Sequence, residues 1–344
     1  MKCLVKTEQE RVLFFCEQGR GLCYRREEDA GVSVLCDRCQ GEFDVLAGEE
    51  LQVACQDDAG NLYFYTQRSG QWHRRLVLSS KREEPAASCL RLWEGEESHF
   101  LFYLLESRGE RLLICHPLEE GRPRALAKVE GTNYLLRADP ADCLSLVYDQ
   151  GGAMLRRYRY GSWGEPVLLG DFHVEDALFE RPDAAHFAVS RRGSLFYLWW
   201  QEGQVRERLP VTRSGQLRPV LLQYEESVFV LYEERGRVFY WKKGERAPAA
   251  VIAGGEPELF HLRFSHGGET GLARCAYGNR LRGRINLFLV GRLPETKKPV
   301  FSDSGMIELT KLRLRLEALE QRMKRLESLE KAQRMPVPPK DDRE

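Results

Sequence analysis

The chain has 344 residues, enough for one large domain or two ordinary ones. Basic and acidic residues number 52 each, so no overall field draws the protein to nucleic acid or to anionic lipid. No apolar run approaches the roughly 20 residues that cross a bilayer, and the first residues lack the apolar core of a secretory signal. Its ten cysteines sit mostly singly in apolar runs, which predicts a reducing, cytoplasmic setting.

A strand–turn–strand unit recurs along the first 290 residues. It is clearest at 186–201, where two apolar runs flank a polar turn that closes on Gly193. Similar units occupy 11–26, 51–68, 99–116, 143–160 and 227–243, and a degenerate copy covers 271–290. The turn glycines recur at a step of about 43 residues, and they are Gly21, Gly60, Gly109, Gly152, Gly193, Gly236 and Gly278. The sequence therefore predicts seven copies of one structural unit.

Two more short strands accompany each hairpin. Apolar segments precede it at 89–93, 134–139, 217–224 and 259–264, and others follow it at 72–78, 123–129, 166–172 and 247–253. Four short strands per unit at this step resemble the blades of a β-propeller, which pack around a central channel. The resemblance covers residues 1–292 and implies an all-β, seven-bladed β-propeller, with a two-sheet sandwich or a barrel as the alternative.

This resemblance is to an architecture rather than to a family. The Gly-His and Trp-Asp pairs of WD repeats are absent, and the Gly-Gly of kelch repeats occurs only at Gly151-Gly152. The last copy lacks a clear fourth strand, which residues 4–8 or 299–303 could supply. A terminal strand that completes the last blade would tie the chain ends together at the seam of the ring.

The character of the sequence changes after Gly291. Residues 293–305 read as a linker, residues 306–334 as an α-helical coiled coil, and residues 335–344 as a disordered tail rich in proline and charge. Apolar residues fill the two core positions of a heptad repeat, and they are Leu309, Leu312, Leu316, Leu319, Met323 and Leu326.

Charged residues beside these core positions indicate how the helices associate. Arg315 and Arg322 fall at g, and Glu320 and Glu327 fall at e, so a parallel coil pairs each arginine with a glutamate of its neighbour. Two consecutive Arg–apolar–x–x–apolar–Glu stretches resemble the pattern of parallel three-stranded coils and imply a homotrimer. Leucine at both core positions leaves a dimer or tetramer open, and one amphipathic helix lying on its own propeller is the alternative.

Two cysteines have the spacing of a metal or redox site. Cys36 and Cys39 form a C-x-x-C, but a closed zinc site needs two further ligands. Cys16 and Cys23 on the first hairpin could complete a four-thiolate site, and Cys3 is another candidate. We predict no metal or cofactor, because a pair of loop thiols after a strand is the simpler interpretation.

Two tryptophans occupy equivalent places after a second turn glycine. Trp72 and Trp163 could stack on sugars, as resemblance to propeller lectins would imply, or pack between blades. No nucleophile elbow, zinc-protease motif or phosphate loop is present. We therefore predict a non-enzymatic scaffold that binds an unidentified protein, clustered by its coil for multivalent binding. The alternatives are a multivalent lectin and a hydrolase or lyase with an active site at the channel.

Overall fold

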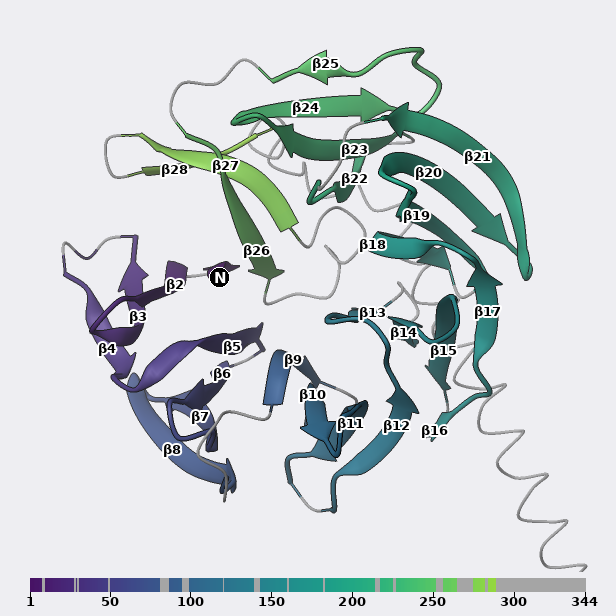
Figure 1. The fold of residues 1–344 in the computed structure, drawn as a ribbon. Coiled ribbons are helices and arrows are strands. Elements are labelled where there is room, and N and C mark those ends of the chain that lie inside the picture. Colours follow the sequence, from purple (N-terminus) through teal and green to yellow (C-terminus); the bar gives the residue numbers. More distant parts are fainter. Residues whose placement is uncertain are drawn as a thin grey trace, which may run out of the picture. The chain divides into compact units, whose positions relative to one another are not determined.

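The computed structural model consists of β-strands that form separate sheets around a central opening (Figure 1). It describes residues 1–288 except 8–9, 28, 30, 49, 81–86, 95–98, 120, 139–142, 160, 182, 214–216, 225–226, 252–255, 265–274 and 282–283. The chain divides into a unit of residues 1–293, described here, and a second unit of residues 294–344. Within the described ranges no helix is long and apolar enough to span a membrane.

Four sheets have four strands each, joined in chain order by antiparallel pairing, and three of them have an outer strand of at least five residues. The first contains β5 (Cys39–Ala47), β6 (Leu51–Asp57), β7 (Leu62–Arg68) and β8 (Gln71–Leu78). The second contains β9 (Ala87–Glu94), β10 (His99–Ser107), β11 (Glu110–Pro117) and β12 (Arg124–Lys128). The third, further along the chain, contains β18 (His173–Arg181), β19 (Ala184–Arg191), β20 (Ser194–Gln201) and β21 (Gln204–Thr212).

Two more sheets vary this pattern at their outer edge. In one, β13 (Leu135–Ala138), β14 (Leu144–Asp149) and β15 (Ala153–Arg159) are followed by β16 (Ser162–Trp163) and β17 (Val167–Gly170), which both pair with β15. The other contains β22 (Val220–Tyr224), β23 (Ser227–Glu234), β24 (Arg237–Lys242) and β25 (Ala249–Ala250). The first strand of each group lies nearest the central opening (Figure 1).

The remaining sheet joins the two ends of the described chain. It unites β1 (Lys2–Lys6), β2 (Arg11–Glu17), β3 (Gly21–Arg26) and β4 (Ser33–Cys36) with β26 (Glu258–Phe264), β27 (Cys275–Leu281) and β28 (Arg284–Leu287). The junction is a parallel ladder between β1 and β26, in which Cys3 lies opposite His261. The N-terminal candidate for a fourth strand of the last copy, residues 4–8, overlaps β1. This strand joins the two ends of the described chain, but it pairs with β26 and not with β28, so it does not add a fourth strand at the outer edge. Residues 299–303, the other candidate, lie outside the described residues.

Tight turns set the hairpins. Arg192-Gly193 and Arg235-Gly236 both have positive φ at each residue, as in the type I′ turns whose twist matches that of paired strands. The alignment of Gly278 as the seventh turn was wrong: it lies inside β27, opposite Leu287, in extended backbone. It is glycine for another reason, because a Cβ atom there would lie 2.7 Å from the carbonyl oxygen of Asn286.

The hydrophobic core lies between neighbouring sheets. One cluster packs Phe102 of β10 and Leu113 of β11 against Leu136 and Leu146 of the next sheet. Another packs Tyr197 of β20 against Val230 and Trp241 of the sheet that follows. Because each strand alternates its side chains between two faces, each sheet covers both of its neighbours. The inner strands lie nearest the centre of the arrangement (Figure 1).

Candidate functional site

Charged residues converge on the centre from five inner strands. They occupy equivalent places on β5, β9, β13, β18 and β26, and they are Asp44, Arg91, Arg137, Asp176 and Arg263. Sequence reasoning missed this set. The available signal was a charged residue within an otherwise apolar inner strand in five of the copies.

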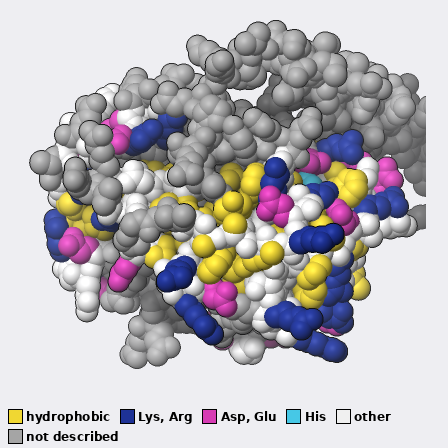
Figure 2. Space-filling model, turned by 90° about the horizontal axis from the view of Figure 1, so that it is seen from above, with side chains coloured by type: hydrophobic (Ala, Val, Ile, Leu, Met, Phe, Trp, Pro, Cys, Tyr) yellow, Lys and Arg dark blue, Asp and Glu magenta, His cyan; other side chains and the backbone are white. Residues whose placement is uncertain are grey.

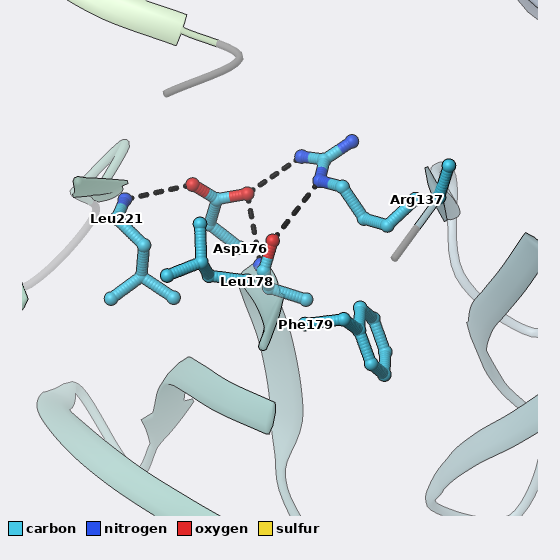
Figure 3. Close-up of a pocket in the computed structure, with 7 residues that line it drawn as sticks. Arg137, Asp176, Leu178, Phe179 and Leu221 are labelled. Carbon is cyan, nitrogen blue, oxygen red and sulfur yellow. Dashed lines mark hydrogen bonds and ion pairs between the residues drawn. The ribbon is translucent and has the colours of Figure 1, made fainter. Parts of the chain in front are cut away.

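The first carboxylate joins three sheets (Figure 3). Asp176 accepts a hydrogen bond of 2.6 Å from Nη2 of Arg137, and its other oxygen accepts one of 2.8 Å from the backbone N–H of Leu221. Nε of Arg137 donates to the carbonyl oxygen of Ala177, 3.1 Å away. These residues line a pocket with room for about one water molecule. Such a pocket cannot admit a sugar ring.

The second carboxylate repeats this arrangement between other sheets. Both oxygens of Asp44 accept from Nη2 of Arg263, at 2.8 and 3.0 Å, and the backbone N–H of Leu92 donates to one of them at 2.8 Å. Nε of Arg263 donates to the carbonyl oxygen of Val45. Burial by itself would lower the pKa of Arg263, but the Asp44 carboxylate more than offsets burial, and the pKa is raised. Arg263 therefore carries its positive charge.

Arg91 forms no ion pair with any described residue. Its Nη1 donates to the carbonyl oxygen of Leu90, 2.7 Å away. Its charge acts on His261 of β26: burial and, after it, the positive charges of Arg91 and Arg263 together lower the pKa of this histidine to about 3. His261 is therefore neutral at physiological pH. Of the five charged residues in this set, three are arginines and two are aspartates, and Arg91 is the arginine outside the two pairs.

A cysteine lies beside this histidine. Sγ of Cys275 is 3.4 Å from Nδ1 of His261, a contact that resembles a nucleophile and its base. Burial, with a smaller contribution from the Asp176 carboxylate, raises the pKa of Cys275 to about 11. A reactive cysteine needs the opposite shift, toward thiolate at neutral pH. Both members of the pair are thus held in their neutral forms.

The two tryptophans pack against neighbouring sheets. Trp72 of β8 meets Phe14 and Tyr24 edge-on, with ring centroids 6.3 and 5.8 Å away. Trp163 of β16 lies 6.0 Å from Phe102 of β10 by the same measure. Both side chains are half-buried, and each belongs to an inter-sheet cluster. Packing between blades, one of the two expected roles, matches these contacts.

Cys36 and Cys39 lie at the boundary between β4 and β5, within a group of thiols. Sγ of Cys16 is 3.7 Å from Sγ of Cys39, and Cys55 of β6 belongs to the same buried cluster. Cys23 instead directs its thiol to the carbonyl oxygen of Gly21. The sequence pointed to Cys16 as a partner but missed Cys55, because nothing in the spacing links β6 to this corner.

The thiol contacts divide the group electrostatically. The contact with Cys16 lowers the pKa of Cys39, and the Cys39 thiol also lies 3.7 Å from the carbonyl oxygen of Glu42. The same contact raises the pKa of Cys16, and burial raises that of Cys55. Among the described residues, no three His, Cys, Asp or Glu side chains already surround a common metal position. The residues expected to oligomerise, from Leu309 to Glu327, lie outside the described residues.

Comparisons with known proteins support the fold. No family model and no curated protein sequence matches the chain. A solved structure of BBS1N in complex with ARL6DN is similar, with a TM-score of 0.50, 11% identity, and coverage of 84% of this chain and 89% of that one. Similarity to the lectin of Aleuria aurantia is weaker, with a TM-score of 0.43, 10% identity, and coverage of 73% and 94%. The chain therefore has an all-β, propeller-like fold.

Proposed function

We propose that the protein is a non-enzymatic scaffold: a seven-bladed propeller, clustered by its C-terminal segment, that binds a protein partner. The state of the central charged groups is the observation that carries the proposal. Both carboxylates bridge sheets, each accepting from a guanidinium group and from a backbone N–H. General acid–base catalysis needs a group that exchanges protons near the working pH. The central groups serve instead to hold the inner strands rigidly together.

The count of seven treats the mixed sheet as two blades. In this interpretation β1–β4 form the first blade and β26–β28 the last, with the parallel ladder of β1 and β26 as their seam. Only Cys3 to Lys6 pair across this seam, whereas antiparallel pairing runs through both blades. A seam that pairs the two ends of the ring protects the inner edges from fraying.

The surface suits a protein partner better than a polyanion. Basic, acidic and apolar side chains are interspersed on the face in Figure 2, as expected from equal numbers of basic and acidic residues. All ten cysteines are free thiols, which supports a reducing, cytoplasmic location. No nucleic-acid or membrane-inserting role is proposed.

Clustering is tested by mass. We expect light scattering to give the full chain about three times the mass of one chain, and residues 1–305 the mass of a single chain. Reversing Arg315 and Arg322 to glutamate brings like charges together at g and e and should dissociate the assembly. Adding Glu320→Arg and Glu327→Arg should restore it. A full-length monomer, or a charge reversal without effect, would contradict the parallel coil.

A glycan array separates the scaffold from the lectin alternative. We expect no binding above background for the full chain, because Trp72 and Trp163 are engaged in packing. We also expect a protein captured from the source cell to be retained less well when residues 306–344 are deleted, since avidity is lost. Sugar binding that disappears in Trp72→Ala and Trp163→Ala, but survives in Trp72→Phe and Trp163→Phe, would replace the scaffold with a lectin.

A further inference from the structure

His99 joins two neighbouring sheets through both nitrogens of its ring. It begins β10, and its Nδ1 lies 2.5 Å from Oε1 of Glu119, in the loop after β11. Its Nε2 lies 2.9 Å from Nε2 of Gln52, which belongs to β6 of the preceding sheet. Oε2 of Glu119 also accepts the backbone N–H of His99, at 2.9 Å. The β9–β12 sheet therefore holds one side of the imidazole, and the β5–β8 sheet holds the other.

Two carboxylates face this imidazole among the described residues. Besides Glu119, Oε1 of Glu94 at the end of β9 lies 3.6 Å from Nε2 of His99. On the side of the β5–β8 sheet, the ring centroid of Phe64 is 6.4 Å from that of His99, and Arg75 of β8 lies over the Phe64 ring. The carboxylates of Glu94 and Glu119 raise the pKa of His99 above its usual 6.5, although burial acts against them. His99 therefore keeps its proton to a higher pH than an ordinary histidine does.

The Gln52 amide has one polar atom that is not used. The residue is only 7% exposed, and within the described part of the chain its Oε1 is buried without a hydrogen-bond partner. With the amide N–H2 group against the ring, Nε2 of His99 has to accept, so the ring is neutral and carries its proton on Nδ1. Half a turn of the amide places Oε1 there instead, where it accepts from a ring that is protonated at both nitrogens. The direction of this hydrogen bond between the two sheets therefore depends on the proton on His99.

We propose that His99 is a proton-controlled joint between the β5–β8 and β9–β12 sheets. When the ring takes up a proton, the Gln52 amide rotates, and the imidazolium donates to Glu119 through Nδ1 and to Oε1 of Gln52 through Nε2. Both bonds then have a charged donor, which strengthens them. When the ring loses this proton at higher pH, Nε2 becomes an acceptor that faces the Glu94 carboxylate, and the joint weakens. The inference is independent of the proposed function, because it concerns how two sheets are held together.

Titration of the full wild-type chain by NMR tests the joint without any variant. We expect the ring signals of His99 to have a titration midpoint above pH 6.5, and both ring nitrogens to carry protons below that pH. The side-chain N–H2 signals of Gln52 should move with the same midpoint, because the amide rotates when the ring is protonated. A midpoint at or below pH 6.5, or Gln52 signals that do not follow the ring, would overturn the proposal.

Three substitutions assign the shift to its carboxylates. Glu94→Gln and Glu119→Gln should each lower the midpoint of His99, since each removes a negative charge that favours the imidazolium. Glu110→Gln is the matched control, because Glu110 is an exposed residue of the same sheet that pairs with Lys128. It should leave the midpoint where it is. A midpoint that moves as far in Glu110→Gln as in Glu119→Gln would contradict the joint.

The pH dependence of stability tests whether the joint holds the sheets. Because the pKa of His99 is raised in the folded chain, its contribution to stability is fully present below about pH 6.5 and is lost as the pH rises through the folded value. Above pH 6.5, the midpoint of urea unfolding should therefore fall more steeply for the wild type than for His99→Gln. The other histidines, His173 included, are common to both proteins. Equal slopes would show that the proton on His99 does not stabilise the fold, and would overturn the proposal.

Discussion

Two ion pairs at the centre of the ring use the same design at different places along the chain. In each, an arginine donates through Nη2 to an aspartate and through Nε to the backbone carbonyl oxygen of the residue after that aspartate. The aspartate also accepts a hydrogen bond from a backbone N–H on a third strand. Arg137 and Asp176 are 39 residues apart, whereas Arg263 and Asp44 are 219 apart. The second pair therefore joins β26, near the end of the described chain, to β5, which follows the β1–β4 strands.

Exposure separates the two pairs further. The Asp44 side chain is 2% exposed, whereas that of Asp176 is 10% exposed. Arg263 also contacts both oxygens of its aspartate, whereas Arg137 contacts one. Removing one member of a buried pair leaves the other charge unpaired, and the penalty rises with burial. We therefore expect the pair of Asp44 and Arg263 to contribute more to the free energy of unfolding than the pair of Asp176 and Arg137.

We expect the largest loss from Asp44→Ala. It leaves the Arg263 guanidinium and the Leu92 N–H without their acceptor, and should lower the free energy of unfolding by about 3–5 kcal/mol. Urea unfolding of the full chain measures this loss. A loss below about 1 kcal/mol would mean that the seam does not depend on the pair.

Asp176→Ala should cost less, about 2–3 kcal/mol in the same measurement, because water at the adjoining pocket can solvate Arg137. Asp57→Ala is not a suitable control, since Asp57 accepts from Ala59 and Asn61 in a turn. Asp171→Ala is suitable, because Asp171 is an exposed partner of Arg191. If Asp176→Ala lowered the free energy of unfolding more than Asp44→Ala did, the expected order of the two pairs would be wrong.

Acid should weaken the seam through His261. Its folded-state pKa is about 3, below the ordinary value of 6.5, so the unfolded chain takes up a proton first as the pH falls. Stability is fully present above about pH 6.5 and is lost toward pH 3, by at most about 1.4 kcal/mol per pH unit. His261→Gln should remove this slope. His99 and His173 have raised pKa values and act oppositely, but they are common to both proteins.

Arg91→Gln should have the smallest effect on stability, within about 1 kcal/mol, because Arg91 has no carboxylate partner among the described residues. Its loss should raise the pKa of His261, since its positive charge contributes to the lowered value. Titration of the His261 ring by NMR measures the shift. An unchanged pKa would show that Arg91 does not act on the seam.

The sequence predicted local structure well, but it did not predict which side chains from distant parts of the chain come together. Turns such as Arg192-Gly193 follow from local chemistry, and so do inner strands such as 259–264, which matches β26. Gly278 misled the alignment because a glycine required by a close backbone approach looks the same as a turn glycine. The pairing of Asp44 with Arg263 depends on ring closure over more than 200 residues, which no local pattern encodes.

The thiol group illustrates the same limit. The C-x-x-C of Cys36 and Cys39 is visible in the sequence, and Cys16 was a reasonable partner because it lies on a nearby hairpin. Cys55 comes from the second strand of another sheet, and only the packing of the sheets brings it into the same buried cluster. Residues gathered by tertiary packing are therefore what the sequence alone leaves out.

A double-mutant cycle on Asp44 and Arg263 tests most directly whether the centre holds the ring closed. The free energy of unfolding is measured for Asp44→Ala, Arg263→Ala and both together, beside the same cycle for Asp176 and Arg137. We predict a coupling energy of at least about 2 kcal/mol for Asp44 with Arg263, and a smaller one for the other pair. Additive losses at Asp44 and Arg263 would contradict the account.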